Sequence, residues 1–198
     1  MPSAPEILAS LTLIANRAWP LAALWHAGLL ALVIALLRGW RPRNGALLGM
    51  LAAPLASVSV LAFAEGNAFN GGVFAVLAVA GLVAASRATG LVRLAASPVA
   101  LVGAGLLAFA WFYPHFLETR PWLYLFAAPM GLVPCPTLAA VAGCTVACNG
   151  LGSRAWSLLV ATAALFYGLF GMLRLGVWLD AGLLLAAAAL LTLARRPT

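Results

Sequence analysis

Charged residues are scarce in this sequence, at 8% of 198 residues, whereas 65% are hydrophobic. A soluble globular domain usually has about 25% charged residues, so this composition excludes an ordinary water-soluble protein. The chain separates into seven apolar runs, each close to the roughly 20 residues that a membrane-spanning helix needs. Little sequence remains for a second domain, and we therefore predict an all-α, polytopic bundle of about seven transmembrane helices.

Lysine is absent, and all 11 basic residues are arginine. A protein without a side-chain amine cannot hold retinal or pyridoxal phosphate as a Schiff base, and it cannot use a lysine nucleophile. The net charge of +7 comes from arginines in short loops beside apolar runs, where such residues set the orientation of a membrane protein. We interpret the charge as a topology signal and expect no nucleic-acid partner.

Catalytic motifs are also missing. The sequence has no Ser-His-Asp spacing, no HExxH, no phosphate-binding glycine loop and no carboxylate pair on one helix. The three cysteines, Cys135, Cys144 and Cys148, are an odd number within apolar runs, which gives no disulfide framework. These absences favour a protein that is not an enzyme, and they leave any cofactor unknown.

The predicted elements are a short interfacial helix and the spans that follow it. Ile7, Leu8, Leu11 and Ile14 share one helical face, which predicts an interfacial segment over residues 1–17 and a single transmembrane domain over 18–198. The start lacks the positive region of a signal peptide, so we expect the first span to be retained. The predicted spans cover residues 18–37, 45–64, 69–86, 94–113, 122–149, 155–173 and 180–194, and Asp180 is the predicted N-cap of the last one.

The arginines predict an orientation for these spans. Eight fall in loops on one side of the predicted bundle and three on the other, and the excess normally marks the cytoplasm. This favours an N-terminus outside and a cytoplasmic C-terminus. The larger group is Arg38, Arg41, Arg43, Arg87, Arg93, Arg154, Arg195 and Arg196, and the smaller group is Arg17, Arg120 and Arg174.

The segment Pro134-Cys135-Pro136-Thr137 lies inside the predicted fifth span. Proline has no backbone N–H and clashes with the preceding helical turn, so we expect the carbonyls of Met130 and Leu132 to lose helical partners. At membrane depth, non-helical backbone is tolerated only where it packs against protein or lines a wet cavity. The sequence therefore predicts a fifth helix broken at Pro134–Thr137, beside a polar pocket that opens outward.

Candidate ligand-binding residues follow from this break and from polar groups in other spans. His26 is an ionisable residue within a span, a position that often has a function; its structural alternative is a neutral imidazole bonded to a neighbouring helix. The candidate substrate-binding residues are Cys135, Thr137, Pro134, Pro136, His26 and Asn70.

A metal site is a second hypothesis for the polar residues. The proline-flanked Cys135 resembles the cysteines of metal-translocating ATPases, where thiolates bind soft metals. His115 and Glu118 are three residues apart and can share a helix face, and Cys144 and Cys148 are one turn apart. The candidate metal ligands are thus Cys135, His115, Glu118, Cys144 and Cys148. The alternatives are a solvated helix end for the His-Glu pair and small buried apolar side chains for the cysteines.

The segment Gly131-Leu132-Val133-Pro134-Cys135-Pro136-Thr137 resembles a Gly-x-x-Pro-Cys-Pro-Thr signature of an uncharacterised bacterial family of small multi-span integral membrane proteins. Further similar pieces, in the same order, are Asn16-x-x-Trp19-Pro20, Asn70, Tyr113-Pro114 and Asp180. His26, His115, Cys144 and Cys148 do not match the pattern. The resemblance implies a multi-pass protein of the bacterial inner membrane and brings no activity or cofactor.

Three functions remain open at this point. Discontinuous helices form the solute sites of many carriers, so we expect binding or transport of a small solute or cation, with a soft metal as one version. The first alternative is a non-catalytic membrane subunit or anchor for a partner protein. The second is an intramembrane enzyme or redox protein. Besides the lipid bilayer and the solute or metal ion, the sequence leaves a homo-oligomer or a partner membrane subunit open.

Overall fold

The computed structural model describes residues 3–118 and 121–195, and these residues form an all-helical protein. This confirms the all-α part of the predicted fold class. Three short 3-10 helices accompany the α-helices: η1 (Pro121–Leu123), η2 (Asn149–Gly152) and η3 (Trp178–Asp180). The α-helices are α1 (Ala4–Arg17), α2 (Trp19–Leu37), α3 (Asn44–Ala64), α4 (Ala68–Arg87), α5 (Ser97–Phe112), α6 (Tyr124–Ala127), α7 (Pro134–Ala147), α8 (Arg154–Arg174) and α9 (Ala181–Ala194).

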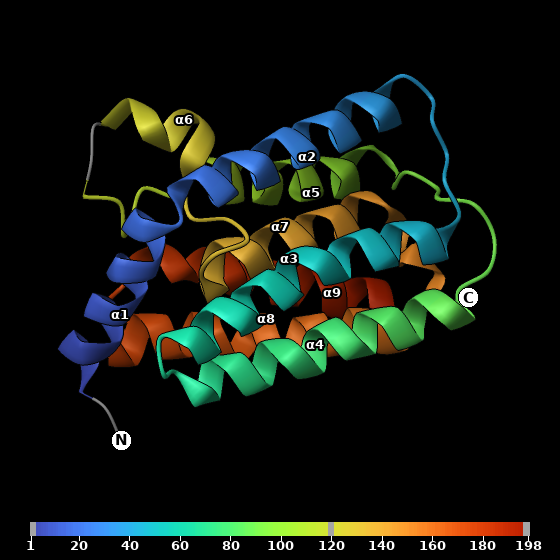
Figure 1. The fold of residues 1–198 in the computed structure, drawn as a ribbon. Helices are drawn as coiled ribbons and strands as arrows, with labels where there is room; N and C mark the ends of the chain where they lie inside the picture. The colour runs from blue at the N-terminus through green and yellow to red at the C-terminus, as the bar shows by residue number, and fades with distance from the viewer. Residues whose placement is uncertain (1–2, 119–120, 196–198) are drawn as a thin grey trace.

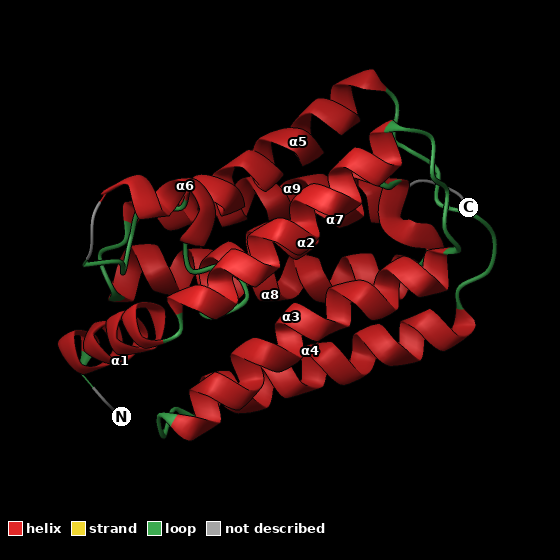
Figure 2. Ribbon diagram, turned by 45° about the horizontal axis from the view of Figure 1, so that its top comes forward, coloured by secondary structure: helices red, strands yellow, loops and turns green. Residues whose placement is uncertain are grey.

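The seven longest helices after α1 run alongside one another, and α1 crosses one end of the bundle (Figures 1 and 2). Helix α7 forms the centre, where every residue from Pro134 to Val146 is buried. Helix α5 approaches it closely, because a Cβ atom on Gly103 would lie only 2.6 Å from the backbone nitrogen of Ala147. Small residues at such contacts allow helices to pack closely in lipid.

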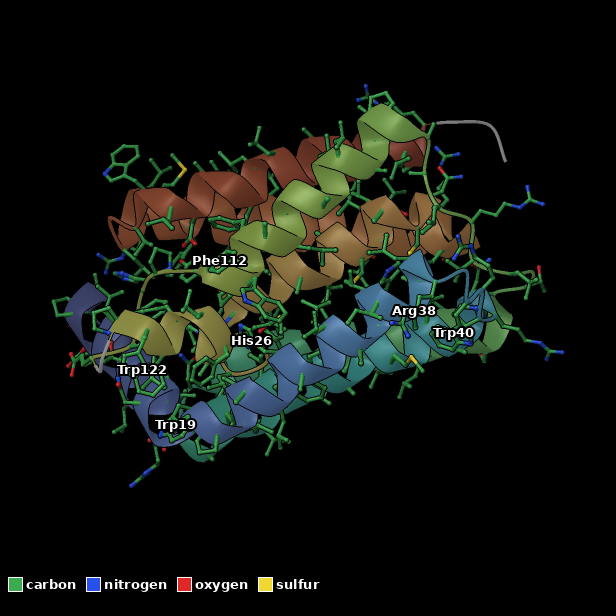
Figure 3. The ribbon with its side chains drawn as sticks, turned by 90° about the horizontal axis from the view of Figure 1, so that it is seen from above. Trp19, His26, Arg38, Trp40, Phe112 and Trp122 are labelled. Carbon is green, nitrogen blue, oxygen red and sulfur yellow. The ribbon has the colours of Figure 1, made fainter. Side chains whose placement is uncertain are left out.

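Four helices, α2, α3, α4 and α8, are long and apolar enough to cross a membrane. Helices α5, α7 and α9 belong to shorter apolar segments. Exposed tryptophans mark both ends of the bundle: Figure 3 shows Trp19 and Trp122 near one end and Trp40 near the other. Tryptophan is enriched at membrane–water interfaces. The 19 residues of α2 span about 28 Å at 1.5 Å per residue, close to the thickness of the hydrocarbon core.

The region around Pro134 corrects one detail of the predicted fifth span. Residues 122–149 do not form one helix with an interruption, because α6 ends at Ala127 and α7 begins at Pro134. Residues 128–133 form turns between them. Pro134 and Pro136 therefore lie in the first turn of α7, where a backbone N–H has no helical partner and proline costs little. The prolines start a helix here rather than break one.

The two ends of the bundle differ in charge. Helices α2, α4 and α7 end near the points where α3, α5 and α8 begin, as backbone hydrogen bonds from Asn44 to Gly90 and from Ala95 to Ala147 show. We call this the arginine-rich end, because its loops and helix ends include Arg38, Arg41, Arg43, Arg87, Arg93, Arg154 and Arg195. The opposite end includes Arg17, Glu65 and Asp180. Arg120 and Arg196 lie outside the described residues.

Candidate functional site

A buried carboxylate connects three helices at the end opposite the arginine-rich end. Asp180 is the last residue of η3, directly before α9, and only 1% of it is exposed. The hydroxyl of Tyr113, which follows α5, donates a hydrogen bond of 2.7 Å to Asp180 Oδ1. The thiol of Cys135 in the first turn of α7 donates to Asp180 Oδ2 at 3.2 Å. We call these three residues the Asp180 cluster.

Helix α8 supplies the surface on which this carboxylate lies. Gly168 and Gly171 are close to Asp180, and a Cβ atom on Gly171 would overlap Asp180 Oδ2. Only glycine leaves room for the carboxylate at that point of α8. The turn after α8 is fixed by a 2.9 Å hydrogen bond from Val177 N–H to the carbonyl of Gly171, and it turns at Gly176, which has a φ of +71°. The end of α8 thus both positions and accommodates Asp180.

A second buried polar contact lies on the same helix. The hydroxyl of Tyr167 donates a 2.8 Å hydrogen bond to Oδ1 of Asn70, in the first turn of α4. Tyr167 and Gly171 are four residues apart and share a face of α8. The pair therefore extends the polar region from the Asp180 cluster toward α4. Asn70, a predicted binding residue, is bonded to protein in this conformation.

The charge of Asp180 has no cationic partner among the described residues. Their one ion pair joins Arg17 to Glu65 at 3.0 Å. Hydrogen bonds from a phenol and a thiol stabilise a carboxylate, but neither group cancels its charge. An isolated charge away from water is costly, and membrane proteins place such groups in ion or proton pathways. The arrangement therefore suits a proton or a small cation as the neutralising group.

Thr137 has a structural role in this conformation. Its hydroxyl accepts a 2.8 Å hydrogen bond from the N–H of Gly131 and donates one of 2.7 Å to the carbonyl of Val133. These bonds fasten the segment before α7 onto its first turn, and Gly131, with a φ of +77°, completes the turn against the ring of Trp25. Both hydrogen bonds of the Thr137 hydroxyl are therefore made to backbone groups, and neither leaves it free to line the expected pocket.

Cys135 is buried and lines neither of two cavities formed by the described residues. One, of about 450 Å³, lies at the arginine-rich end, and the other, an apolar one of about 300 Å³, lies between α2 and α5. Tyr113 is fully buried, as are Pro134, Pro136 and Thr137 within the core. The motif is therefore shielded from lipid and from solvent alike.

His26 joins α2 to α5 rather than contacting the Asp180 cluster. Its Nδ1 lies 2.9 Å from the carbonyl oxygen of Ala22, and its Nε2 lies 3.1 Å from that of Trp111 (Figure 3). Trp111 is in the last turn of α5, where carbonyls lack partners within the helix. The side chain therefore contacts the neighbouring helix α5, as the structural alternative expects.

The five predicted metal ligands do not form one site. Within residues 3–118 and 121–195, no three His, Cys, Asp or Glu side chains are close enough to hold a metal ion. Cys144 is nine residues after Cys135 on one helix, a rise of about 13 Å, and Cys148 is farther still. His115 packs against the ring of Phe116 at 4.3 Å, while the backbone of Glu118 binds the side chain of Asn16.

Sequence patterns missed the role of Asp180 and its partners. Asp180 is the N-cap residue of α9, as predicted, but its side chain makes no capping hydrogen bond and is directed to Tyr113 and Cys135 instead. Asp180 is the one acidic residue at the start of an apolar run, and Tyr113 ends another. The positions of Asp180 and Tyr113 at the ends of apolar runs could be seen in the sequence. The hydrogen bond between the two residues could not.

These features define the class of protein. Four apolar helices of spanning length, many exposed apolar side chains along the bundle and tryptophans at both ends identify a membrane-associated protein. Comparisons of the chain with protein-family models, with curated proteins and with solved structures found no match.

Proposed function

We propose that this chain is a membrane carrier that binds a proton or a small monovalent cation at Asp180 during transport. The observation that carries the proposal is a carboxylate that is 1% exposed, receives hydrogen bonds from Tyr113 and Cys135, and has no ion-pair partner in the described part of the chain. In low dielectric, such a charge needs a counter-ion or a proton.

The charge of the cluster favours a monovalent ion. The Tyr113 hydroxyl and the Cys135 thiol are neutral donors, so the cluster carries the single negative charge of Asp180. One proton or one monovalent cation makes the cluster neutral, whereas a divalent ion would leave a buried positive charge that costs several kcal/mol. Carboxylate and phenol oxygens also suit hard cations better than soft ones.

The position of the cluster supports a gated site. Tyr113, Cys135 and Asp180 lie where α5 ends and where α7 and α9 begin. The three residues therefore lie at helix ends, next to turns, and not in the middle of continuous helices. A movement of the turns at residues 113–118 or 175–180 would expose Asp180 to the end of the bundle, and a return movement would close it. The present conformation corresponds to the closed state of that cycle.

The same proposal includes the membrane arrangement. All seven long helices cross the bilayer of a bacterial inner membrane, with the arginine-rich end in the cytoplasm and the Asp180 cluster toward the outside. The gathering of arginines at one end supports this orientation, and the tryptophans at both ends support a bundle that spans the bilayer. Membership of the resembled bacterial family is part of the proposal, and the sequence of the Gly131 to Thr137 motif is the observation that supports it.

Flux measurements on reconstituted protein test the proposal. Proteoliposomes containing a pH-sensitive or a sodium-sensitive dye would be given a proton or a sodium gradient, with protein-free liposomes as the baseline. Wild type should carry one of the two ions above baseline, and Asp180→Asn should lose that flux because an amide cannot exchange a proton or neutralise a cation. Glu118→Gln, which removes an exposed acid outside the cluster, should keep it.

Two results would overturn the proposal. One is equal flux through wild type and Asp180→Asn, which would remove the carboxylate from the mechanism. The other is wild-type flux at the liposome baseline for both ions, which would favour a subunit or anchor.

A further inference from the structure

A second polar site lies at the arginine-rich end, far from the Asp180 cluster along the bundle. An open cavity of about 450 Å³ is lined there by the start of α3, the α4–α5 loop, η2, the start of α8 and the end of α9. Small-molecule sites usually measure about 300–1,000 Å³. Its polar lining includes the side chains of Asn44, Thr89, Arg93, Ser153, Arg154 and Ser157.

The walls of this cavity are held in place by specific hydrogen bonds. Asn44 joins two of them, since its side-chain amide donates to the carbonyl of Thr89 at 2.8 Å and its backbone N–H donates to Gly90 at 3.0 Å. The α4–α5 loop is also tied to α7 by the bond from Ala95 to Ala147 at 2.8 Å. The cavity is therefore a formed feature of the fold.

The charge of the cavity is positive and uncompensated within the described residues. Arg93 and Arg154 both line it, and neither makes an ion pair in that part of the chain. The four acidic side-chain residues lie elsewhere: Glu6 caps α1, Glu65 binds Arg17, the backbone of Glu118 binds Asn16, and Asp180 binds Tyr113. Two exposed arginines thus border a polar cavity that has no acidic residue among its described lining residues.

We infer that this cavity binds a phosphate group, carried either by the headgroup of an anionic phospholipid or by a soluble phosphate ester. The planar guanidinium of arginine matches phosphate oxygens with two parallel hydrogen bonds. Ser153 adds a hydroxyl proton, because its oxygen only accepts a bond from the N–H of Trp156. The N–H groups at the start of α8, which begins at Arg154, have no partner within the helix. The volume leaves space for the glycerol or sugar that bears the phosphate.

The place of the cavity also suits this ligand. It lies at the end of the bundle that holds Arg38 and Trp40 (Figure 3), where a spanning protein meets lipid headgroups and the adjoining water. A phospholipid headgroup and a soluble phosphate ester can both reach this end of the bundle. The site needs no contribution from Asp180 and stands independently of cation transport.

Binding measurements on the purified protein in detergent separate the two sources. Native mass spectrometry would count bound phosphatidylglycerol against a neutral galactolipid without phosphate, and calorimetry would titrate glycerol 3-phosphate and inorganic phosphate. The double variant Arg93→Gln/Arg154→Gln should weaken binding by about tenfold for each charge removed. Arg87→Gln is the matched control, because Arg87 ends α4 at the same end but does not line the cavity.

The outcomes are distinguishable. Preference for phosphatidylglycerol alone identifies the headgroup as the source, and binding of glycerol 3-phosphate identifies a soluble ester. Equal retention of phosphatidylglycerol and galactolipid by wild type, with no heat from either soluble phosphate, would overturn the inference without any variant. Unchanged binding in a folded double variant, or equal losses in Arg87→Gln, would overturn it as well.

Discussion

The substitution Gly171→Ala tests how closely α8 and Asp180 fit together. A Cβ atom at this position would overlap Asp180 Oδ2 and would lie 2.7 Å from the carboxylate carbon and 2.9 Å from Asp180 Cβ. The helix of Gly171 and the start of α9 are both packed in the core, so neither can move freely. We expect the carboxylate to be displaced and its 3.2 Å hydrogen bond from Cys135 to be lost.

Three energies set the expected size of the effect. Extra atoms in a packed core cost about 1–3 kcal/mol, and the lost hydrogen bond adds about 1 kcal/mol. Alanine in place of glycine inside a helix returns about 0.5–1 kcal/mol. We therefore expect Gly171→Ala to lower the free energy of unfolding by about 2 kcal/mol.

Equilibrium unfolding in mixed micelles of SDS and a mild detergent, followed by far-UV circular dichroism, measures this change. The matched control is Gly105→Ala in α5, where no atom lies within 4 Å of the added Cβ; it should leave stability unchanged or raise it slightly. If Gly171→Ala unfolds at the same SDS fraction as wild type and Gly105→Ala, the described contact between α8 and Asp180 is wrong.

Three further predictions use other contacts. Tyr167→Phe leaves Asn70 without its 2.8 Å donor and should cost about 1–2 kcal/mol in the same unfolding assay; wild-type stability would contradict the bond. Gly103→Ala places a Cβ 2.6 Å from a backbone nitrogen of α7 and should cost about 1–3 kcal/mol, whereas an unchanged midpoint would refute this close helix contact. Hydrogen bonds from Ser3 hold the pKa of Glu6 below its usual value, so the capping stability is present at neutral pH and is lost as the pH falls through that lowered pKa. Ser3→Ala should raise the Glu6 pKa part of the way back, as measured by NMR titration, and an unchanged pKa would show that the Ser3 hydroxyl does not contribute.

Much of the helical layout could be predicted, because apolar runs are bounded by residues that end helices. The predicted spans 18–37 and 45–64 correspond to α2 and α3 within one residue at each end. The fourth predicted span began too early, at residue 94. Helix α5 begins at Ser97 with Pro98 in its first turn, which is a favoured place for proline. The prediction of one interrupted helix over residues 122–149 differs from the structure for the same reason, because prolines inside an apolar run can start a helix as well as interrupt one.

The Asp180 cluster was harder to predict because its contacts are long-range. Cys135 was a candidate from its flanking prolines, but its partner Asp180 is 45 residues away, and Tyr113 is 67 residues from Asp180. Helix periodicity identifies neighbours three or four residues apart and gives no information on such pairs. An aspartate before an apolar run is also a typical N-cap, so local rules assigned Asp180 a role that its tertiary contacts replace.

The occupancy of Asp180 is measured most directly by infrared difference spectroscopy on membranes containing the protein. Spectra recorded with and without sodium, and across a pH step, report the carboxyl and carboxylate bands of residues that bind the ion or proton. We expect a difference band in wild type that persists in Glu118→Gln and is absent from Asp180→Asn. A wild-type spectrum identical to that of Asp180→Asn under both changes would contradict a cation or proton site at this carboxylate.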